Sequence, residues 1–235
     1  MPAKNVVKFY LPNSIYHIYN RGVEKRKIFL DEQDHKVFLN YLKEYLSIPP
    51  DKQTLSKDFT LKGVTFKSVP PQIKNFSDEI QLFAFCLMPN HVHLLIKQIN
   101  KDSIKKFTHA LFTRYSMYFN KKYNRRGPLF EGTYKATNVI NKDYLLDITR
   151  YIHRNPLKIT KNLVDYYSSY AHYLNQFNIP WVKNKDVLDY FNESGFVRHN
   201  NIKSYKYFVE EFKYQNEELD LSSDLKGLHP TNGQF

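Results

Sequence analysis

Two histidines one residue apart, His91 and His93, are the first side chains in this sequence whose spacing suits chemistry. They lie in the run 91–97 (HVHLLIK), which predicts a β-strand. Side chains at i and i+2 of a strand point to the same face, so the two imidazoles would form a two-ligand platform for a divalent cation, with Val92 on the opposite, buried face. Pro89-Asn90 predicts a tight turn that brings the pair near the edge of a sheet. Without further evidence, a His-X-His sequence in a strand more often serves packing than metal binding.

A metal site needs at least one more protein ligand, and the predicted helix 142–154 offers a candidate. Tyr151 and Asn155 are four residues apart and therefore share one helix face. The amide oxygen of Asn155 is a hard ligand suited to Mg²⁺ or Mn²⁺. A phenol with its usual pKa near 10 is a poor nucleophile, but a nearby cation would favour the phenolate of Tyr151. The alternative is that Tyr151, one of 19 tyrosines, is only a half-buried helix aromatic.

Positive charge is concentrated between residues 101 and 136, where nine basic and two acidic residues give +7 of the net +12. Aromatic residues are interleaved with these cations, a pattern typical of a groove for single-stranded nucleic acid. The alternative is a solvated helix face beside core aromatics. The side chains predicted to contact DNA are Arg21, Lys121, Lys122, Arg125, Arg126 and Lys135.

Composition favours the same class of partner. The 235-residue chain has a pI of about 9.5 and 16% aromatic residues, which indicates a polyanionic partner or, alternatively, a basic surface kept for solubility. Its single cysteine, Cys86, lies in an apolar run and is expected in the core of a protein in a reducing cytosol. Without a long apolar stretch or a signal-peptide pattern, the sequence predicts a cytoplasmic protein with no membrane partner.

The elements that must position these residues can be predicted from periodicity and breakers. Strands are expected at 14–20, 80–88, 91–97 and 134–140, and helices at 31–47, 102–120 and 142–154, with Asp31 as an N-cap. The polar segment at about 51–79 is expected to be an insertion with a hairpin around Lys62-Gly63. This order predicts an α+β fold in which helices pack on one face of an antiparallel sheet. Two short helices near 184–192 and 201–214 and a mobile tail from Asp220 would follow.

Several of these strings together resemble one known family. Residues 88–95 (MPNHVHLL) resemble the HUH motif of single-tyrosine transposases. Residues 16–22 (YHIYNRG), 127–132 (GPLFEG), 151–156 (YIHRNP) and 168–170 (SSY) resemble blocks of the branch called REP-associated tyrosine transposases. The matches run in order from about residue 14 to 173, and this combination is far more specific than any one block.

The resemblance implies a ferredoxin-like or RRM-like sheet that carries the histidine pair on a central strand. It implies a transposase domain over residues 1–180, with the insertion at about 51–79, and a helical extension over 181–235. The implied activity is cleavage and joining of single-stranded hairpin DNA with REP-like palindromes, by a monomer or a homodimer. The residue matching Tyr151 would form a 5′-phosphotyrosine link, and His91, His93 and Asn155 would hold Mg²⁺ or Mn²⁺.

The sequence departs from the family in three places, one of which is the insertion at about 51–79, longer than expected for the family. Thr133 stands where a basic residue is frequent, and Asn155 is one methylene shorter than the glutamine common in insertion-sequence relatives. Two other classes of function compete with the transposase. One is a non-catalytic, RRM-like protein that binds hairpin nucleic acid, which would have no need for the histidines, Tyr151 and Asn155 together. The other is a metal hydrolase of small phosphoesters, which the net charge of +12 disfavours.

Overall fold

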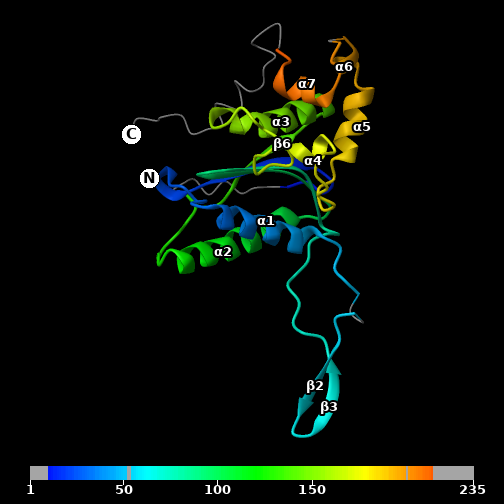
Figure 1. Ribbon diagram of the computed structural model, residues 1–235. Helices are drawn as coiled ribbons and strands as arrows, with labels where there is room; N and C mark the ends of the chain where they lie inside the picture. The colour runs from blue at the N-terminus through cyan, green and yellow to red at the C-terminus, as the bar shows by residue number, and fades with distance from the viewer. Residues whose placement is uncertain (1–9, 52–53, 200, 214–235) are drawn as a thin grey trace.

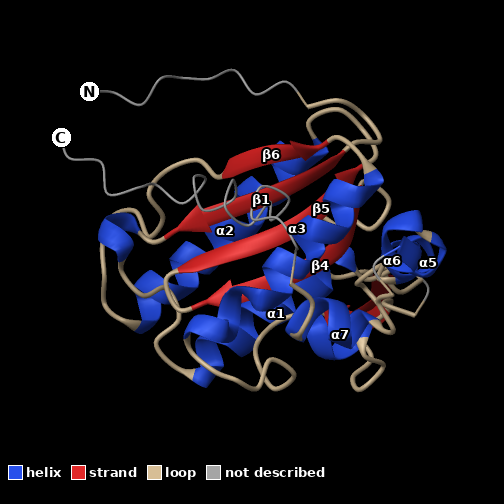
Figure 2. Ribbon diagram, turned by 90° about the horizontal axis from the view of Figure 1, so that it is seen from above, coloured by secondary structure: helices blue, strands red, loops and turns tan. Residues whose placement is uncertain are grey.

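A four-stranded antiparallel sheet with the strand order β4-β5-β1-β6 forms the centre of the molecule (Figure 2). The structure, a computed structural model, describes residues 10–51, 54–199 and 201–213. The elements are β1 (Ile15–Arg21), η1 (Val23–Lys25), α1 (Glu32–Leu46), β2 (Lys57–Leu61), β3 (Val64–Ser68), β4 (Ile80–Met88), β5 (His91–Gln98), α2 (Ser103–Lys122), β6 (Lys135–Val139), α3 (Lys142–Arg154), η2 (Asn155–Lys158), α4 (Tyr170–Tyr173), α5 (Lys185–Glu193), α6 (Gly195–His199) and α7 (Tyr205–Glu210). The predicted strands and long helices are therefore confirmed to within two residues at either end.

Helices cover both faces of this sheet. On one face, Ile18, Val92 and Leu94 pack into a core shared with α1 and α2. On the other face, Cys86 and Leu95 pack against α3 and the C-terminal helices, so these layers lie on opposite sides of the strands (Figure 1). The predicted α+β class with an antiparallel sheet is confirmed, and the second helical layer adds to the single layer expected. The reason is that β4 is apolar on both faces from Leu82 to Met88 and must be covered on both.

The chain after residue 180 completes this second core. The apolar side chains Val187 of α5 and Phe208 of α7 are fully buried with those of α3. Arg150 of α3 donates from Nε to the carbonyl oxygen of Phe208 at 2.6 Å, which ties α7 to α3. Helices near both predicted positions are confirmed, α6 was not predicted, and the division into parts at residue 180 stays a prediction. The predicted mobile tail from Asp220 lies outside the described residues.

The predicted hairpin around Lys62-Gly63 is formed by β2 and β3. Both turn residues have positive φ angles, 50° and 79°, as a two-residue hairpin turn of type I′ requires. The hairpin extends away from the sheet and its helices (Figure 1). Phe59 and Phe66 face each other across it with their ring centroids 6.3 Å apart, and both remain exposed. Among the described residues, no helix is long and apolar enough to cross a membrane.

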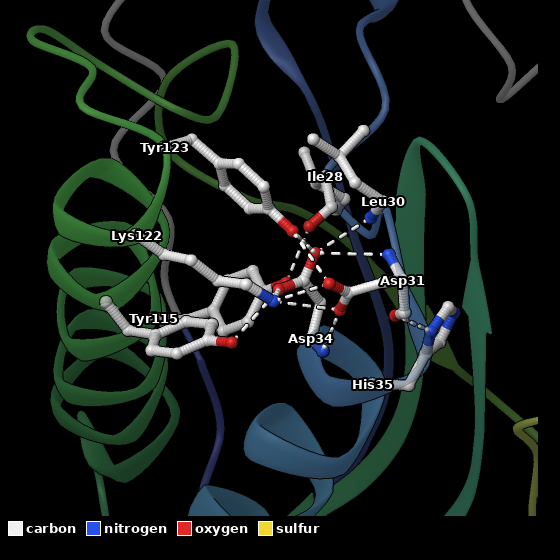
Figure 3. A network of polar contacts seen from close by, with 9 residues as sticks. Ile28, Leu30, Asp31, Asp34, His35, Tyr115, Lys122 and Tyr123 are labelled. Carbon is white, nitrogen blue, oxygen red and sulfur yellow. Dashed lines mark hydrogen bonds and ion pairs between the residues drawn. The ribbon is translucent and has the colours of Figure 1, made fainter.

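A buried carboxylate joins the start of α1 to the end of α2 (Figure 3). Asp31 caps α1 as predicted, in a reciprocal capping box with Asp34. Lys122 of α2 places its Nζ 2.7 Å from Asp31 and 2.8 Å from Asp34, and Tyr123 donates its hydroxyl to Asp34 at 2.8 Å. Burial by itself would raise the pKa of Asp34, but the hydrogen bonds from Lys122 and from the Leu30 N–H outweigh it and lower the pKa.

We predict that Asp34→Asn lowers the free energy of unfolding by about 2–4 kcal/mol at neutral pH, because it removes the buried negative charge paired with Lys122 and puts an NH₂ donor in place of one of the two oxygens that accept from Tyr118 and Tyr123. A lowered pKa means that the carboxylate stabilises the fold above its unfolded pKa of about 4, and that this contribution is lost as the pH falls. The deficit of the variant is therefore expected to shrink below about pH 4.

Urea unfolding of the variant and the parent across pH measures this difference. Lys36→Met is the matched control, because it removes an exposed ion pair with Glu32 from the same helix and is expected to cost only about 0.3–0.5 kcal/mol. A deficit for Asp34→Asn no larger than that of the control would contradict the assignment of a central role to this network.

Candidate active site

The two candidate ligands lie on one face of β5, as predicted. The ring centroids of His91 and His93 are 4.8 Å apart and their planes are nearly perpendicular, at 87°. Val92 points to the opposite face and is fully buried there, which confirms the predicted alternation. The turn at residues 89–90 joins β4 to β5, so His91 pairs with Met88 at the end of the hairpin. His91 is half-buried and His93 is buried.

Each of these histidines contacts another side chain through its Nδ1 atom. His91 Nδ1 lies 2.7 Å from Oδ1 of Asn90, and His93 Nδ1 lies 2.9 Å from Nε2 of His17. With Nδ1 engaged in this way on both rings, Nε2 is the nitrogen that each ring would offer to a metal ion. The contacts of both Nδ1 atoms are thus consistent with ligation through Nε2.

His17 belongs to this site, although sequence reasoning did not single it out. It lies on β1, is 1% exposed, and stacks on His93 with ring centroids 5.1 Å apart. Its position in the alternating run SIYHIYN indicates that it shares a face with Tyr19. Only the pairing of β1 with β5 brings that face beside His93, and this pairing is not readable from the sequence.

Tyr151 of α3 lies over the same face of the sheet. Its ring centroid is 5.6 Å from that of His93 and 5.9 Å from that of His17, and both contacts are edge-to-face. The helix is held there by its apolar side, with Ile148 and Ile152 fully buried in the second core. The structure thus brings Tyr151 and the histidine pair together within one chain.

The phenol of Tyr151 has a strongly perturbed environment. Burial raises the pKa of Tyr151 to about 12, whereas a hydrogen bond with the Asn155 side chain acts to lower it. Asn155 is 6% exposed, follows α3 directly, and donates from Nδ2 to the Tyr151 carbonyl oxygen at 3.0 Å. The phenol is protonated at neutral pH, so a reaction through its oxygen requires a positive charge close by.

The cations predicted to contact DNA fall into three groups. Lys135 of β6 is exposed and pairs with Tyr19, and its Nζ lies 5.5 Å from the centroid of that ring, beside His93. Lys121 and Arg126 are exposed at the end of α2 and in the loop that follows. The third group consists of cations that are bonded to other side chains of the protein: Arg21, Lys122 and Arg125.

The third group is anchored through specific contacts. Arg21 forms a two-point contact with Glu131, at 2.8 and 3.1 Å. Lys122 is paired with the two aspartates at the start of α1. Arg125 donates to Asn120 Oδ1 at 2.8 Å and so orders the loop. A DNA contact by any of these three stays a prediction.

The donor set of the site suits the small cation predicted from sequence. Within the described residues, no group of three or more His, Cys, Asp or Glu side chains is placed to hold a metal. A site built on His91 and His93 would therefore need a neutral oxygen donor, and Asn155 is buried next to Tyr151. Two imidazoles and an amide oxygen leave positions open for phosphate oxygens on Mg²⁺ or Mn²⁺.

Comparison with known proteins gives one family match. Residues 64–155 match the family model described as "Transposase IS200 like", a segment that includes both histidines, Tyr151 and Asn155. A solved structure described as a REP-associated tyrosine transposase bound to a REP hairpin is similar at 12% sequence identity, with a TM-score of 0.49, over 79% of this chain and 93% of that chain. No curated protein matches the chain.

The helix that carries Tyr151 is anchored by a buried histidine, and this predicts a pH dependence. His153 Nε2 lies 2.8 Å from the Ser169 hydroxyl and its Nδ1 lies 2.9 Å from the Tyr205 hydroxyl. Burial lowers the pKa of His153 to about 3. Between that value and the unfolded pKa of about 6.5 the unfolded chain binds the extra proton, so the fold loses stability as the pH falls through this range.

We therefore expect His153→Gln to flatten the loss of stability between pH 6.5 and 4, as measured by thermal unfolding at a series of pH values. His109→Gln is the control, because His109 is an exposed side chain of α2. An unchanged pH slope in His153→Gln would mean that His153 is not neutral in the folded protein.

Proposed function

Because residues 64–155 match the IS200-like transposase family, we propose that this protein is a metal-dependent endonuclease and strand transferase of single-stranded DNA. The proposed substrate is hairpin DNA of the REP-like kind, and the proposed intermediate is a covalent 5′-phosphotyrosine. The observation that carries the proposal is the position of Tyr151, whose ring lies 5.6 Å from that of His93, a member of the HUH motif. A non-catalytic DNA-binding protein would have no use for this juxtaposition.

The proposed metal ligands are His91, His93 and Asn155, with Mg²⁺ or Mn²⁺ as the ion. The two imidazoles are supported by their adjacent positions on β5 and by the contacts that occupy both Nδ1 atoms. Asn155 is supported by its burial one helical turn after Tyr151. When bound, the ion would polarise the phosphate and stabilise negative charge on the phenolate and the leaving oxygen.

The proposed chemistry is carried by the Tyr151 oxygen. The phenol gives up its proton to water, and the phenolate oxygen attacks the phosphorus of a backbone phosphodiester. A bond forms between this oxygen and phosphorus while the bond from phosphorus to the 3′-oxygen breaks, and that oxygen leaves as a free 3′-hydroxyl after taking a proton. Attack by a 3′-hydroxyl on the phosphotyrosine reverses the step and joins strands, so no external energy source is needed.

Tyr151 and the histidines come from the same chain, which supports a monomer with a complete site, although the proposal also allows a homodimer. The exposed cations Lys121, Arg126 and Lys135 are proposed to bind the phosphates of the DNA strand. Lys135 is placed best, because its ammonium lies over Tyr19 at the edge of the site.

Tyr151→Phe is predicted to abolish cleavage of hairpin DNA with single-stranded flanks and to change DNA affinity by less than a few-fold, because it removes only the attacking oxygen. The measurement uses a labelled pool of hairpin oligonucleotides with randomised flanks and Mn²⁺. A covalent protein–DNA adduct is expected on a denaturing gel for the parent chain and not for Tyr151→Phe.

Tyr144→Phe is the matched control, since Tyr144 lies on the same helix and is also half-buried. It is expected to form the adduct at the parent level. An adduct that persists in Tyr151→Phe would overturn the assignment of the nucleophile, and binding without any adduct in the parent chain would favour the non-catalytic protein.

The basic surface predicts a salt effect on DNA binding. Lys135→Gln and Arg126→Gln are each expected to lower the slope of log affinity against log salt concentration by about 1, because each removes one phosphate contact. Lys122→Met is expected to change this slope less, since its ammonium is paired with Asp31 and Asp34. Filter binding at several salt concentrations measures the slopes, with Lys36→Met of α1 as the control. Equal slopes for all four variants would place the DNA on another surface.

A further inference from the structure

The buried histidine of β1, His17, contacts one of the candidate metal ligands directly. His17 Nε2 lies 2.9 Å from His93 Nδ1, and the two rings are within 16° of parallel. His17 pairs with Leu95 of β5, and His93 pairs with Tyr19 of β1, so the two histidines are diagonal neighbours on one face of the sheet. Because β1 is bonded to strands on both sides, the position of His17 is fixed by the sheet.

The neighbouring ligand shows how such a contact orients an imidazole. Asn90 Nδ2 donates to the Lys25 carbonyl oxygen at 3.3 Å, which assigns the other end of the amide, Oδ1, to the contact with His91 Nδ1 at 2.7 Å. An amide oxygen only accepts, so His91 carries its proton on Nδ1. The lone pair of its Nε2 is then the one that would bind a metal ion.

The same logic applies to His93 and assigns a role to His17. A neutral imidazole that binds a metal through Nε2 carries its proton on Nδ1, and this N–H needs an acceptor. His17 Nε2 lies within hydrogen-bond distance of His93 Nδ1, at 2.9 Å. We propose that His17 is a positioning residue of the metal site, which accepts the hydrogen bond from His93 Nδ1–H and thereby fixes the proton and the ring orientation that turn His93 Nε2 toward the metal.

This inference rests on the proposed metal-dependent function and goes beyond it, since it assigns a task to a side chain that is not among the proposed ligands. Within the described residues the three histidines do not themselves form a three-ligand metal group, which separates the role of His17 from that of a ligand. In this arrangement His17 carries its own proton on Nδ1 and acts on the metal through His93. In the same way, the side-chain oxygen of Asn90 accepts the hydrogen bond from His91 Nδ1–H and orients that ring.

The test measures Mn²⁺ affinity by electron paramagnetic resonance of the free ion, on the full chain without DNA. His17→Leu removes the acceptor and is expected to weaken Mn²⁺ binding by about 10–100-fold. His17→Gln keeps an acceptor oxygen near the place of Nε2 and is expected to restore the affinity to within a few-fold. His172→Leu is the control, because it removes a hydrogen-bonded histidine of α4 and is expected to leave the affinity unchanged.

A second readout follows the proton itself. In ¹⁵N spectra of the metal-free protein, His93 is expected as the Nδ1–H tautomer in the parent chain and in His17→Gln, and as a mixture of tautomers in His17→Leu. This readout needs only the parent chain and His17→Gln if His17→Leu does not fold. An Nε2–H tautomer of His93 in the parent chain would overturn the inference.

The closing comparison separates this inference from the proposed function. If His93→Ala binds Mn²⁺ as tightly as the parent chain, the proposed metal site is wrong. If His93→Ala loses Mn²⁺ binding while His17→Leu retains both the affinity and the Nδ1–H tautomer of His93, the role of His17 is wrong and the proposed function stands. Weaker binding in His17→Leu with recovery in His17→Gln supports the positioning role.

Discussion

The register between β1 and β5 is the constraint on which the whole site depends. It places Tyr19 opposite His93 and Arg21 opposite His91, and it brings His17 to the Nδ1 atom of His93. Because the side chains of a strand alternate with a period of two, a slip of one residue would turn the histidines into the apolar core beneath α1 and α2. The fully buried Val92 and Leu94 oppose such a slip, since it would remove them from the core shared with α1 and α2. The core on one face of the sheet therefore determines the chemistry on the other.

The second helical layer uses burial both to position Tyr151 and to hold its oxygen in the protonated form. Ile148 and Ile152 hold α3 on the sheet. Arg150 and His153 of the same helix form hydrogen bonds with Phe208 and Tyr205 of α7. The burial that brings Tyr151 beside His93 also raises the pKa of Tyr151 to about 12. In the proposed reaction, a phenol in this environment would need a nearby cation before its oxygen could attack a phosphate.

Positive charge in this protein serves two distinct purposes. Lys122 forms an ion pair with the buried carboxylate of Asp34, which links α1 to α2 (Figure 3). Arg21 forms an ion pair with Glu131. These cations shape the scaffold, and their charge is balanced within the chain. Lys121, Arg126 and Lys135 remain at the surface and contribute to the excess positive charge that a nucleic-acid strand would meet. In the fold, the basic residues that the sequence groups together therefore divide into cations paired within the protein and cations exposed at its surface.

The sequence by itself determined the local elements and the face on which each candidate residue lies. Alternation placed His91 and His93 on one side of a strand, the four-residue spacing placed Tyr151 and Asn155 on one side of a helix, and Asp31 was recognisable as a helix cap. The apolar run from Leu82 to Met88 in β4 indicates cover on both faces, which the single helical layer predicted from the order of the elements lacks. Only the tertiary structure decided that His17 meets His93 and that Lys122 is paired with Asp34. Periodicity reports the orientation of a side chain within its own element, whereas contacts between elements depend on strand register and helix packing, which arise from the whole core.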